Sequence, residues 1–146
     1  MRKQQYFACL KLLNLPEILF ITHYQLLLYM DANKILDYCL AKKGVEETFP
    51  FDNETLVLKV GGKMFLLMGL EKQPLSIAVK TYPEWSEELR EKHPQITGAY
   101  HMNKTHWNSV LCEGLKKDLI LKLIDSSYDL VLNSLTKKKR EEVLNS

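Results

Sequence analysis

The sequence predicts an α+β fold in which an antiparallel sheet of about four to five strands carries helices packed on one face. Apolar residues recur at helical spacing in three separate segments of the chain. Between the first two of these segments, three short apolar runs follow one another with only turn residues between them. Strands that neighbour each other in sequence and are flanked by helices are typical of the α+β class. A length of 146 residues suits one domain with a substantial core.

The first helix is expected over residues 32–43, after Asp31, which is a good N-cap. Its apolar side chains recur every three to four residues and form one stripe: Ala32, Ile35, Leu36, Cys39 and Leu40. Gly44 fits the left-handed position that commonly ends a helix. Residues 45–54 contain two phenylalanines, a proline and several polar residues, and we interpret them as a loop.

Three consecutive strands are expected at residues 55–60, 63–70 and 75–80. Gly61-Gly62 joins the first two strands and predicts a two-residue hairpin, because both glycines tolerate positive φ. Residues 71–74 make a second turn, so the three strands form an antiparallel meander.

Both faces of this hairpin are apolar in the register that a two-residue turn imposes. One face receives Leu56, Leu58, Val60, Phe65 and Leu67. The opposite face receives Val57, Lys59, Met64, Leu66 and Met68. Three interpretations stay open: the second face is covered, it is a contact surface, or the register differs by one residue.

A second helix is expected to begin near Thr81, which has capping-box spacing with Glu84. Trp85 and Leu89 lie four residues apart and are expected to face the core. The helix is expected to stop before Pro94, because a residue that precedes proline disfavours the helical conformation.

The last third of the chain is expected to contain a loop, a strand and a helix. We interpret residues 95–100 as a loop and residues 105–112 as a fourth strand. A long helix is expected over residues 115–132, because its apolar side chains form one stripe. A basic run at residues 137–140 lies near the end of the chain.

The formal net charge is +2, from 20 basic and 18 acidic residues. Residues 1–29 contain three basic residues and one acidic residue, which leaves 17 of each sign in the rest of the chain. A neutral domain cannot bind nucleic acid through its total charge. Such binding would need a surface on which the basic residues are segregated.

The chain divides into an N-terminal extension, residues 1–29, and a folded domain, residues 30–146. The extension is too interrupted by polar residues for a signal peptide, and its apolar runs are too short to cross a bilayer. Two interpretations stay open: an extra helix that packs on the domain, or a segment upstream of a natural start at Met30. We expect no function in this extension and no membrane partner.

The three cysteines, Cys9, Cys39 and Cys112, are odd in number and far apart in the sequence. No pair has the spacing of a structural zinc site, and a disulfide framework is not indicated. We interpret them as reduced cysteines of a cytoplasmic protein. We expect neither a metal nor a cofactor.

The densest polar cluster is residues 100–108. Two interpretations stay open: a loop that packs Trp107 into the core, or an exposed polar surface with a stacking aromatic side chain. Ser109 or Cys112 could form a dyad with His106, but no glycine-flanked elbow supports a nucleophile. Phosphate-binding loop spacing is also absent from the sequence. We therefore expect a binding module rather than an enzyme.

One segment, HMNKTHWNSV at residues 101–110, is distinctive. Further pieces occur in a fixed order along the chain: Phe49-Pro50-Phe51, the hairpin 58–65, residues 75–80, Leu89-Arg90, residues 127–131 and the run 135–140. Together these pieces resemble the MmcQ/YjbR family of small bacterial proteins, collinearly over residues 31–140. Residues 1–29 have no counterpart in the family, and Thr136 stands where the family often has proline.

The resemblance implies a frataxin/CyaY-like two-layer sandwich, which agrees with the order of elements above. It also implies binding of double-stranded DNA through a double-wing surface, with the Gly61-Gly62 hairpin as a wing. The residues that would take part are Lys59, Lys63, Lys80, Asn103, Lys104, His106, Trp107, Lys137, Lys138 and Arg140. The basic side chains would contact phosphates, Asn103 or His106 would donate hydrogen bonds, and Trp107 would pack. The alternative is a non-enzymatic module that binds an unknown protein partner or a small ligand.

Overall fold

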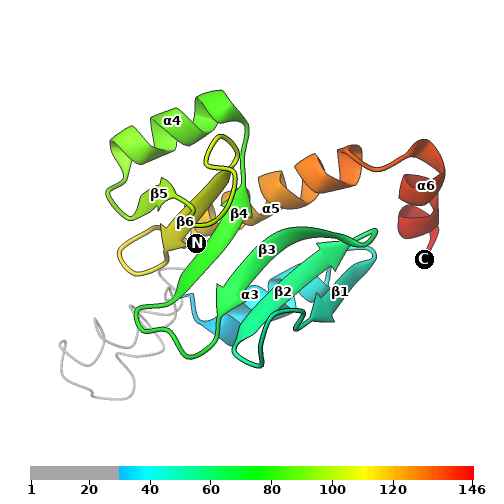
Figure 1. The fold of residues 1–146 in the computed structure, drawn as a ribbon, viewed down its shortest axis with the longest axis horizontal. Helices are drawn as coiled ribbons and strands as arrows, with labels where there is room; N and C mark the ends of the chain where they lie inside the picture. The colour runs from blue at the N-terminus through cyan, green and yellow to red at the C-terminus, as the bar shows by residue number, and fades with distance from the viewer. Residues whose placement is uncertain (1–29) are drawn as a thin grey trace, which may run out of the picture.

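The computed structural model describes residues 30–146, so the expectations for residues 1–29 lie outside the described part. The described residues form a six-stranded antiparallel sheet and four helices (Figure 1). In chain order the elements are α3 (Ala32–Leu40), β1 (Val45–Thr48), β2 (Thr55–Val60), β3 (Lys63–Gly69), β4 (Ser76–Lys80), α4 (Pro83–Lys92), β5 (Ile96–Gly98), β6 (Trp107–Leu111), α5 (Lys117–Asn133) and α6 (Lys137–Asn145).

The strands are ordered β1-β2-β3-β4-β6-β5 across the sheet. Figure 1 shows α3 and α5 together on one side of the sheet, where α5 packs on the central strands β2, β3 and β4. Helix α4 packs beside the edge strand β5. This arrangement confirms the predicted α+β class with helices on one face. The opposite side of the sheet, called the open face below, is covered by no helix of the described residues.

The sheet has six strands rather than four to five, because β1 and β5 fall in segments that were expected to be loops. Strand β1 is four residues long and pairs with β2 from Val45 to Thr48. Strand β5 is three residues long and pairs only with β6. Strands this short contain too few alternating residues to be recognised from periodicity.

A β-bulge in β3 corrects the predicted faces of the hairpin. The pairs beside the Gly61-Gly62 turn are those that a two-residue turn predicts. Beyond them Leu58 pairs with Leu66, so Phe65 has no partner in β2 and the register shifts by one residue. The side that the helices cover therefore receives Leu56, Leu58, Leu66 and Met68, and the open face receives Val57 and Leu67. The alternative of a register that differs by one residue is the correct one.

Two helix ends also differ from the predictions. The N-cap of α4 is Tyr82, which makes no side-chain cap, rather than Thr81. Thr81 is fully buried instead, and its hydroxyl lies 2.5 Å from the hydroxyl of Ser86. Helix α6 was not predicted; it begins after Thr136, whose side chain accepts a hydrogen bond from the Lys139 N–H.

The C-terminal segment docks on two glycine turns at one end of the sheet. Gly44 and Gly61 both have positive φ, at 62° and 57°. A Cβ on Gly44 would lie 2.7 Å from Val143 Cγ1, and a Cβ on Gly61 would lie 2.5 Å from Leu135 Cδ1. Both turns therefore need glycine for conformation and for close approach. The contact with Leu135 brings the tip of the β2–β3 hairpin beside the start of α6.

The core lies between the sheet and the helices α3 and α5 and includes two of the three cysteines. Cys39 is 0% exposed and Cys112 is 4% exposed. Burial raises the pKa of the Cys39 thiol to about 12, and burial raises the pKa of the Cys112 thiol to about 12 as well. Both are therefore inert thiols at neutral pH. Within residues 30–146, no helix combines the length and apolarity needed to cross a membrane.

The burial of Cys39 and Cys112 predicts that their thiols react slowly with reagents in the folded protein. In a Cys9→Ser variant, we expect the thiols of the native chain to react with a disulfide reagent at pH 8 at least ~10³-fold more slowly than in denaturant, because reaction requires opening of the core. As pH rises from 9 towards 12, the unfolded chain loses the thiol protons while the folded chain keeps them, so stability should fall over that window. Rapid native reaction of either cysteine would contradict the burial.

Candidate functional site on the open face and its basic end

The open face is built by every second residue of the strands. By the register of the ladders it receives Val57 and Lys59 from β2, Met64, Leu67 and Gly69 from β3, Ser76, Ala78 and Lys80 from β4, and Trp107, Ser109 and Leu111 from β6. Several of these side chains are small, so the middle of the face is recessed relative to its surroundings. Two longer segments rise around it: the β3–β4 turn and the loop from Ala99 to His106.

Three of the predicted DNA-binding lysines meet at one end of this sheet. The ladder places Lys59 opposite Met64, Val60 opposite Lys63, and Lys80 opposite Trp107. Lys80 Nζ lies 5.6 Å from the centre of the Trp107 ring. Lys63 Nζ donates to the backbone carbonyl of Ser134 over 3.2 Å, which holds it beside the start of α6.

Three further lysines extend this end. Lys104 lies in the loop before β6, with its stem over Gly98 at 3.3 Å from the ideal Cβ position. Lys137 and Lys138 are exposed on the first turn of α6, next to the hairpin tip. We call the set Lys59, Lys63, Lys80, Lys104, Lys137 and Lys138 the basic end. Within residues 30–146, none of these six ammonium groups lies within 4.0 Å of a carboxylate.

The remaining predicted residues have mainly structural contacts. Asn103 accepts a hydrogen bond from the Thr105 N–H over 2.9 Å, and its carbonyl accepts from the N–H groups of His106 and Trp107. His106 is half-buried, and Trp107 is only 7% exposed. Arg140 donates to Asn133 Oδ1 at 3.4 Å on the surface of the C-terminal helices. The interpretation that Trp107 packs is therefore the one that the structure supports.

A buried polar network explains much of the HMNKTHWNSV segment. Arg90, on α4, donates from Nε to Asn108 Oδ1 over 2.9 Å and from Nη2 to the carbonyls of Lys104 and Trp107. Asn108 is 0% exposed and also donates to Thr81 Oγ1 over 2.9 Å. These bonds fix the loop that ends at β6. The motif thus positions the loop, and the network was not identified from sequence because its members come from three separate elements.

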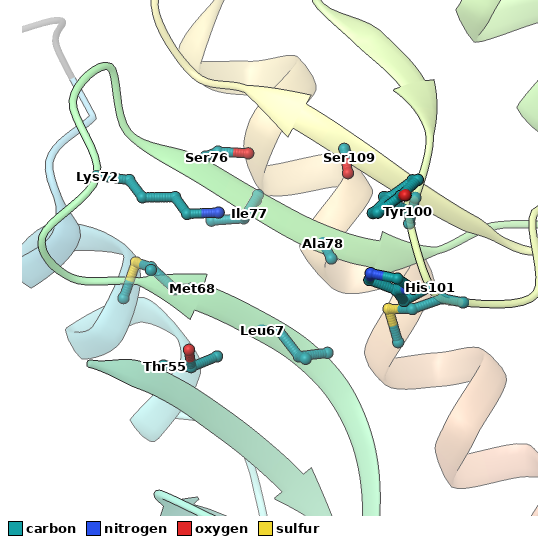
Figure 2. A pocket seen from close by; sticks show the side chains of 13 residues that line it. Thr55, Leu67, Met68, Lys72, Ser76, Ile77, Ala78, Tyr100, His101 and Ser109 are labelled. Atoms are coloured by element: carbon teal, nitrogen blue, oxygen red, sulfur yellow. The ribbon is translucent and has the colours of Figure 1, made fainter. Parts of the chain in front are cut away.

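A hollow of about 270 Å³ lies on the open face, between the β3–β4 turn and the loop that precedes β6. Its polar lining includes Thr55, Lys72, Ser76, Tyr100, His101 and Ser109. Figure 2 shows Lys72 reaching in from the β3–β4 turn, with Tyr100 and His101 on the other side. Sequence reasoning did not select Lys72, Ser76 or Ser109 as a set, because they lie on segments that only the folded sheet brings together.

Within residues 30–146, the side chains expected for a metal site or a nucleophile–base pair are not brought together. Among residues 30–146, no three His, Cys, Asp or Glu side chains gather as they would around a metal ion. Ser109 faces the hollow, but no hydrogen bond joins it to His106 within the described part of the chain. Cys112 is buried in the core rather than placed beside a base. The chemistry that these surfaces support is binding through cations and hydroxyl groups.

Comparison with known proteins identifies a matching family and several similar proteins. A family model described as YjbR matches residues 40–130. The uncharacterized protein YjbR of Escherichia coli strain K12 is 33% identical over 113 residues, which is 77% of this chain and 96% of that protein. The uncharacterized protein YbdF of Escherichia coli O157:H7 is 37% identical over 100 residues, covering 68% of this chain and 82% of that protein.

Two crystal structures are similar in fold and sequence. Deinococcus radiodurans protein DR2400, which has a DUF419 domain, matches with a TM-score of 0.72 and 40% identity, over 76% of this chain and 86% of that chain. A protein from Pseudomonas syringae matches with a TM-score of 0.61 and 29% identity, over 70% of this chain and 99% of that chain.

Proposed function

The chain belongs to the YjbR family, and from this premise we propose that it is a DNA-binding protein that grips phosphates with the lysines of its basic end. The observation that carries the proposal is that six lysines, none with a carboxylate partner among residues 30–146, lie at one end of the sheet and on the adjoining α6. Ammonium groups without carboxylate partners at one end of a domain suit a phosphate backbone. Lys59 and Lys80 lie on the open face, and Lys63, which donates to Ser134, lies on the side that the helices cover. The β2–β3 hairpin would serve as one wing of a double-wing surface.

An uneven distribution of charge between the two ends of the sheet supports the placement of DNA at the basic end. Residues 30–146 are neutral overall, so a basic end requires acidic residues elsewhere. The opposite end carries four acidic residues in its turns, Asp52, Glu54, Glu71 and Glu113, together with Lys72, Lys116 and Lys117; at the basic end, Glu46 lies opposite Lys59 in the β1–β2 ladder. The greater positive charge of the basic end would orient the protein with that end on the duplex. The free donors of Asn103 and His106 lie in the loop beside Lys104 and would supply hydrogen bonds, while Trp107 supports Lys80.

The test is fluorescence anisotropy of the full chain with a labelled random duplex at about 50 and 200 mM salt. With about six phosphate contacts, log K against log salt should have a slope near −5. The variant Lys59→Ala, Lys63→Ala, Lys104→Ala should lower the affinity and reduce the slope to roughly −3, because three contacts remain.

The matched control carries the same loss of charge away from the basic end: Lys72→Ala, Lys116→Ala and Lys117→Ala. It should retain the slope of the parent chain and most of its affinity. Equal loss in the two triple variants would show that total charge, rather than the basic end, governs binding. An affinity that does not change with salt would refute the phosphate-binding mode.

The proposal describes a cytoplasmic binding module rather than an enzyme. Two buried, protonated thiols suit a reducing compartment. The second candidate function, a module for a small ligand, is favoured by a different observation, which is the hollow on the open face.

A further inference from the structure

Four polar side chains face the hollow with unused hydrogen-bonding capacity. Lys72 comes from the β3–β4 turn, Ser76 from β4, His101 from the loop before β6, and Ser109 from β6. None of these side chains hydrogen-bonds or ion-pairs with another group of residues 30–146. Donors that converge on one concave site without protein partners are available to a ligand.

Lys72 is laid across the sheet by the absence of a side chain on Gly69. An ideal Cβ at Gly69 would lie 3.0 Å from Lys72 Cδ and 3.1 Å from Lys72 Cγ. The stem therefore rests on β3 where a side chain would otherwise stand. Figure 2 shows the Lys72 side chain extending from the β3–β4 turn into the hollow, rather than away from the protein.

His101 closes the opposite side in a conformation that costs energy. Its φ of 62° lies in the left-handed region, which non-glycine residues rarely adopt. Its ring packs on Tyr100, with 4.0 Å between the ring centres and 58° between the planes. Residues held in sparsely populated conformations cluster at ligand sites, where the strain preserves a binding geometry. The bond from the Ala99 N–H to the Trp107 carbonyl, at 3.0 Å, anchors the start of this loop.

The lining selects the charge and the size of a ligand. Among residues 30–146, no aspartate or glutamate lines the hollow, so a cation would meet Lys72 without a counter-charge. Its floor is apolar and includes Leu67 and Ala78, and Met102 lines it from the loop before β6. A volume of about 270 Å³ lies just below the range of roughly 300–1,000 Å³ that is typical of drug-sized ligands.

We propose that this hollow binds a small organic anion, whose carboxylate or phosphate is held by Lys72 and Ser76, whose apolar body rests on Leu67 and Ala78, and whose far end meets Ser109 and His101. Charge-assisted hydrogen bonds from an ammonium group to such an anion are among the stronger polar contacts in proteins. Lys72 lies at the end of the sheet opposite to Lys59, Lys63 and Lys80, whereas Lys104 Nζ of the basic end lies 5.9 Å from the centre of the Tyr100 ring at the rim of the hollow.

The test is an amide chemical-shift titration of the full chain with benzoate and, separately, with phenyl phosphate. Benzyl alcohol and benzylamine serve as the neutral and cationic probes of similar size. We expect saturable shifts around Ser76, Ala78, His101 and Ser109 with either anion, at a dissociation constant of ~1 mM or below. Comparison of the two anions distinguishes a carboxylate site from a phosphate site.

Two variants localise the effect. Lys72→Met keeps the stem and removes the charge, and it should weaken anion binding about tenfold. Gly69→Ala keeps the charge but displaces the stem, and it should weaken binding in the same direction. Lys116→Met, with the same change of charge outside the hollow, should bind like the parent chain.

Two results would overturn the proposal: no saturable shifts with either anion at 20-fold the expected constant, or equal shifts with benzylamine. Unchanged binding by Lys72→Met would overturn it as well. The outcome is independent of DNA binding, because a double Lys59→Ala, Lys63→Ala variant changes two residues of the basic end and none that lines the hollow, so it should retain anion binding.

Discussion

Replacement of Asn108 by leucine is expected to lower the free energy of unfolding by about 3 kcal/mol or more. The side chain is 0% exposed, and its amide group donates to Thr81 Oγ1 and to the His106 carbonyl while its oxygen accepts from Arg90 Nε. Leucine has a similar volume but no polar atoms. The partners would therefore stay buried or half-buried with fewer hydrogen bonds, and each such group costs about 1–3 kcal/mol.

Urea denaturation followed by circular dichroism measures this loss. The matched control is Ser109→Ala, the next residue on β6, whose side chain faces the hollow and makes no hydrogen bond with another group of residues 30–146. That control should change stability by less than about 0.5 kcal/mol. If Asn108→Leu cost less than about 1 kcal/mol, the network around Arg90 would not be what holds the loop.

Replacement of Ser127 by alanine is expected to lower the free energy of unfolding by about 2–4 kcal/mol. Ser127, on α5, is 0% exposed and its hydroxyl reaches into the sheet. It accepts from the Lys80 N–H over 2.8 Å and donates to the Phe65 carbonyl over 2.5 Å. The β3–β4 ladder pairs Leu66 with Val79 but does not extend to Phe65 and Lys80, so the hydroxyl bridges the strands where the bulge ends the pairing.

Alanine would leave a backbone donor and a backbone acceptor unpaired beside the core. Besides the shift in denaturation midpoint, hydrogen exchange of the Lys80 amide should become faster in Ser127→Ala. Ser126→Ala, the half-buried neighbour on the same helix, is the control and should leave both quantities nearly unchanged. Normal protection of the Lys80 amide in Ser127→Ala would contradict the bridging role.

The part of the fold that sequence predicted is the part that local signals determine. Gly61-Gly62 predicted the hairpin turn and the first pairs beside it correctly. The bulge at Phe65 was not predictable, because the hydroxyl that satisfies its carbonyl comes from Ser127, 62 residues away. Likewise Thr81 had the spacing of a helix cap, but its tertiary partners Ser86 and Asn108 draw it into the core.

For the candidate sites too, the sequence identified some residues, whereas their arrangement in space depends on tertiary contacts. The lysines of the basic end were identified one by one from the resemblance, but only the antiparallel register places Lys59, Lys63 and Lys80 at one end of the sheet. The hollow had no sequence signal, since Lys72 looks like any lysine in a polar turn. Its position depends on Gly69, and the contact between these residues appears only when the turn folds over β3.

The two outer strands carry a consequence for behaviour at high concentration. A long, flat outer strand exposes unpaired backbone groups that recruit strands from other molecules and start aggregation. Strand β1 is only four residues long and carries Glu46 and Glu47, and β5 is only three residues long. Both edge strands are short, and the two glutamates of β1 would repel the same strand of a second molecule. Edge-to-edge addition of a second copy is therefore disfavoured. Strands β1 and β5, which were not predicted from the sequence, thus end the sheet on both sides and prevent its extension into a fibre.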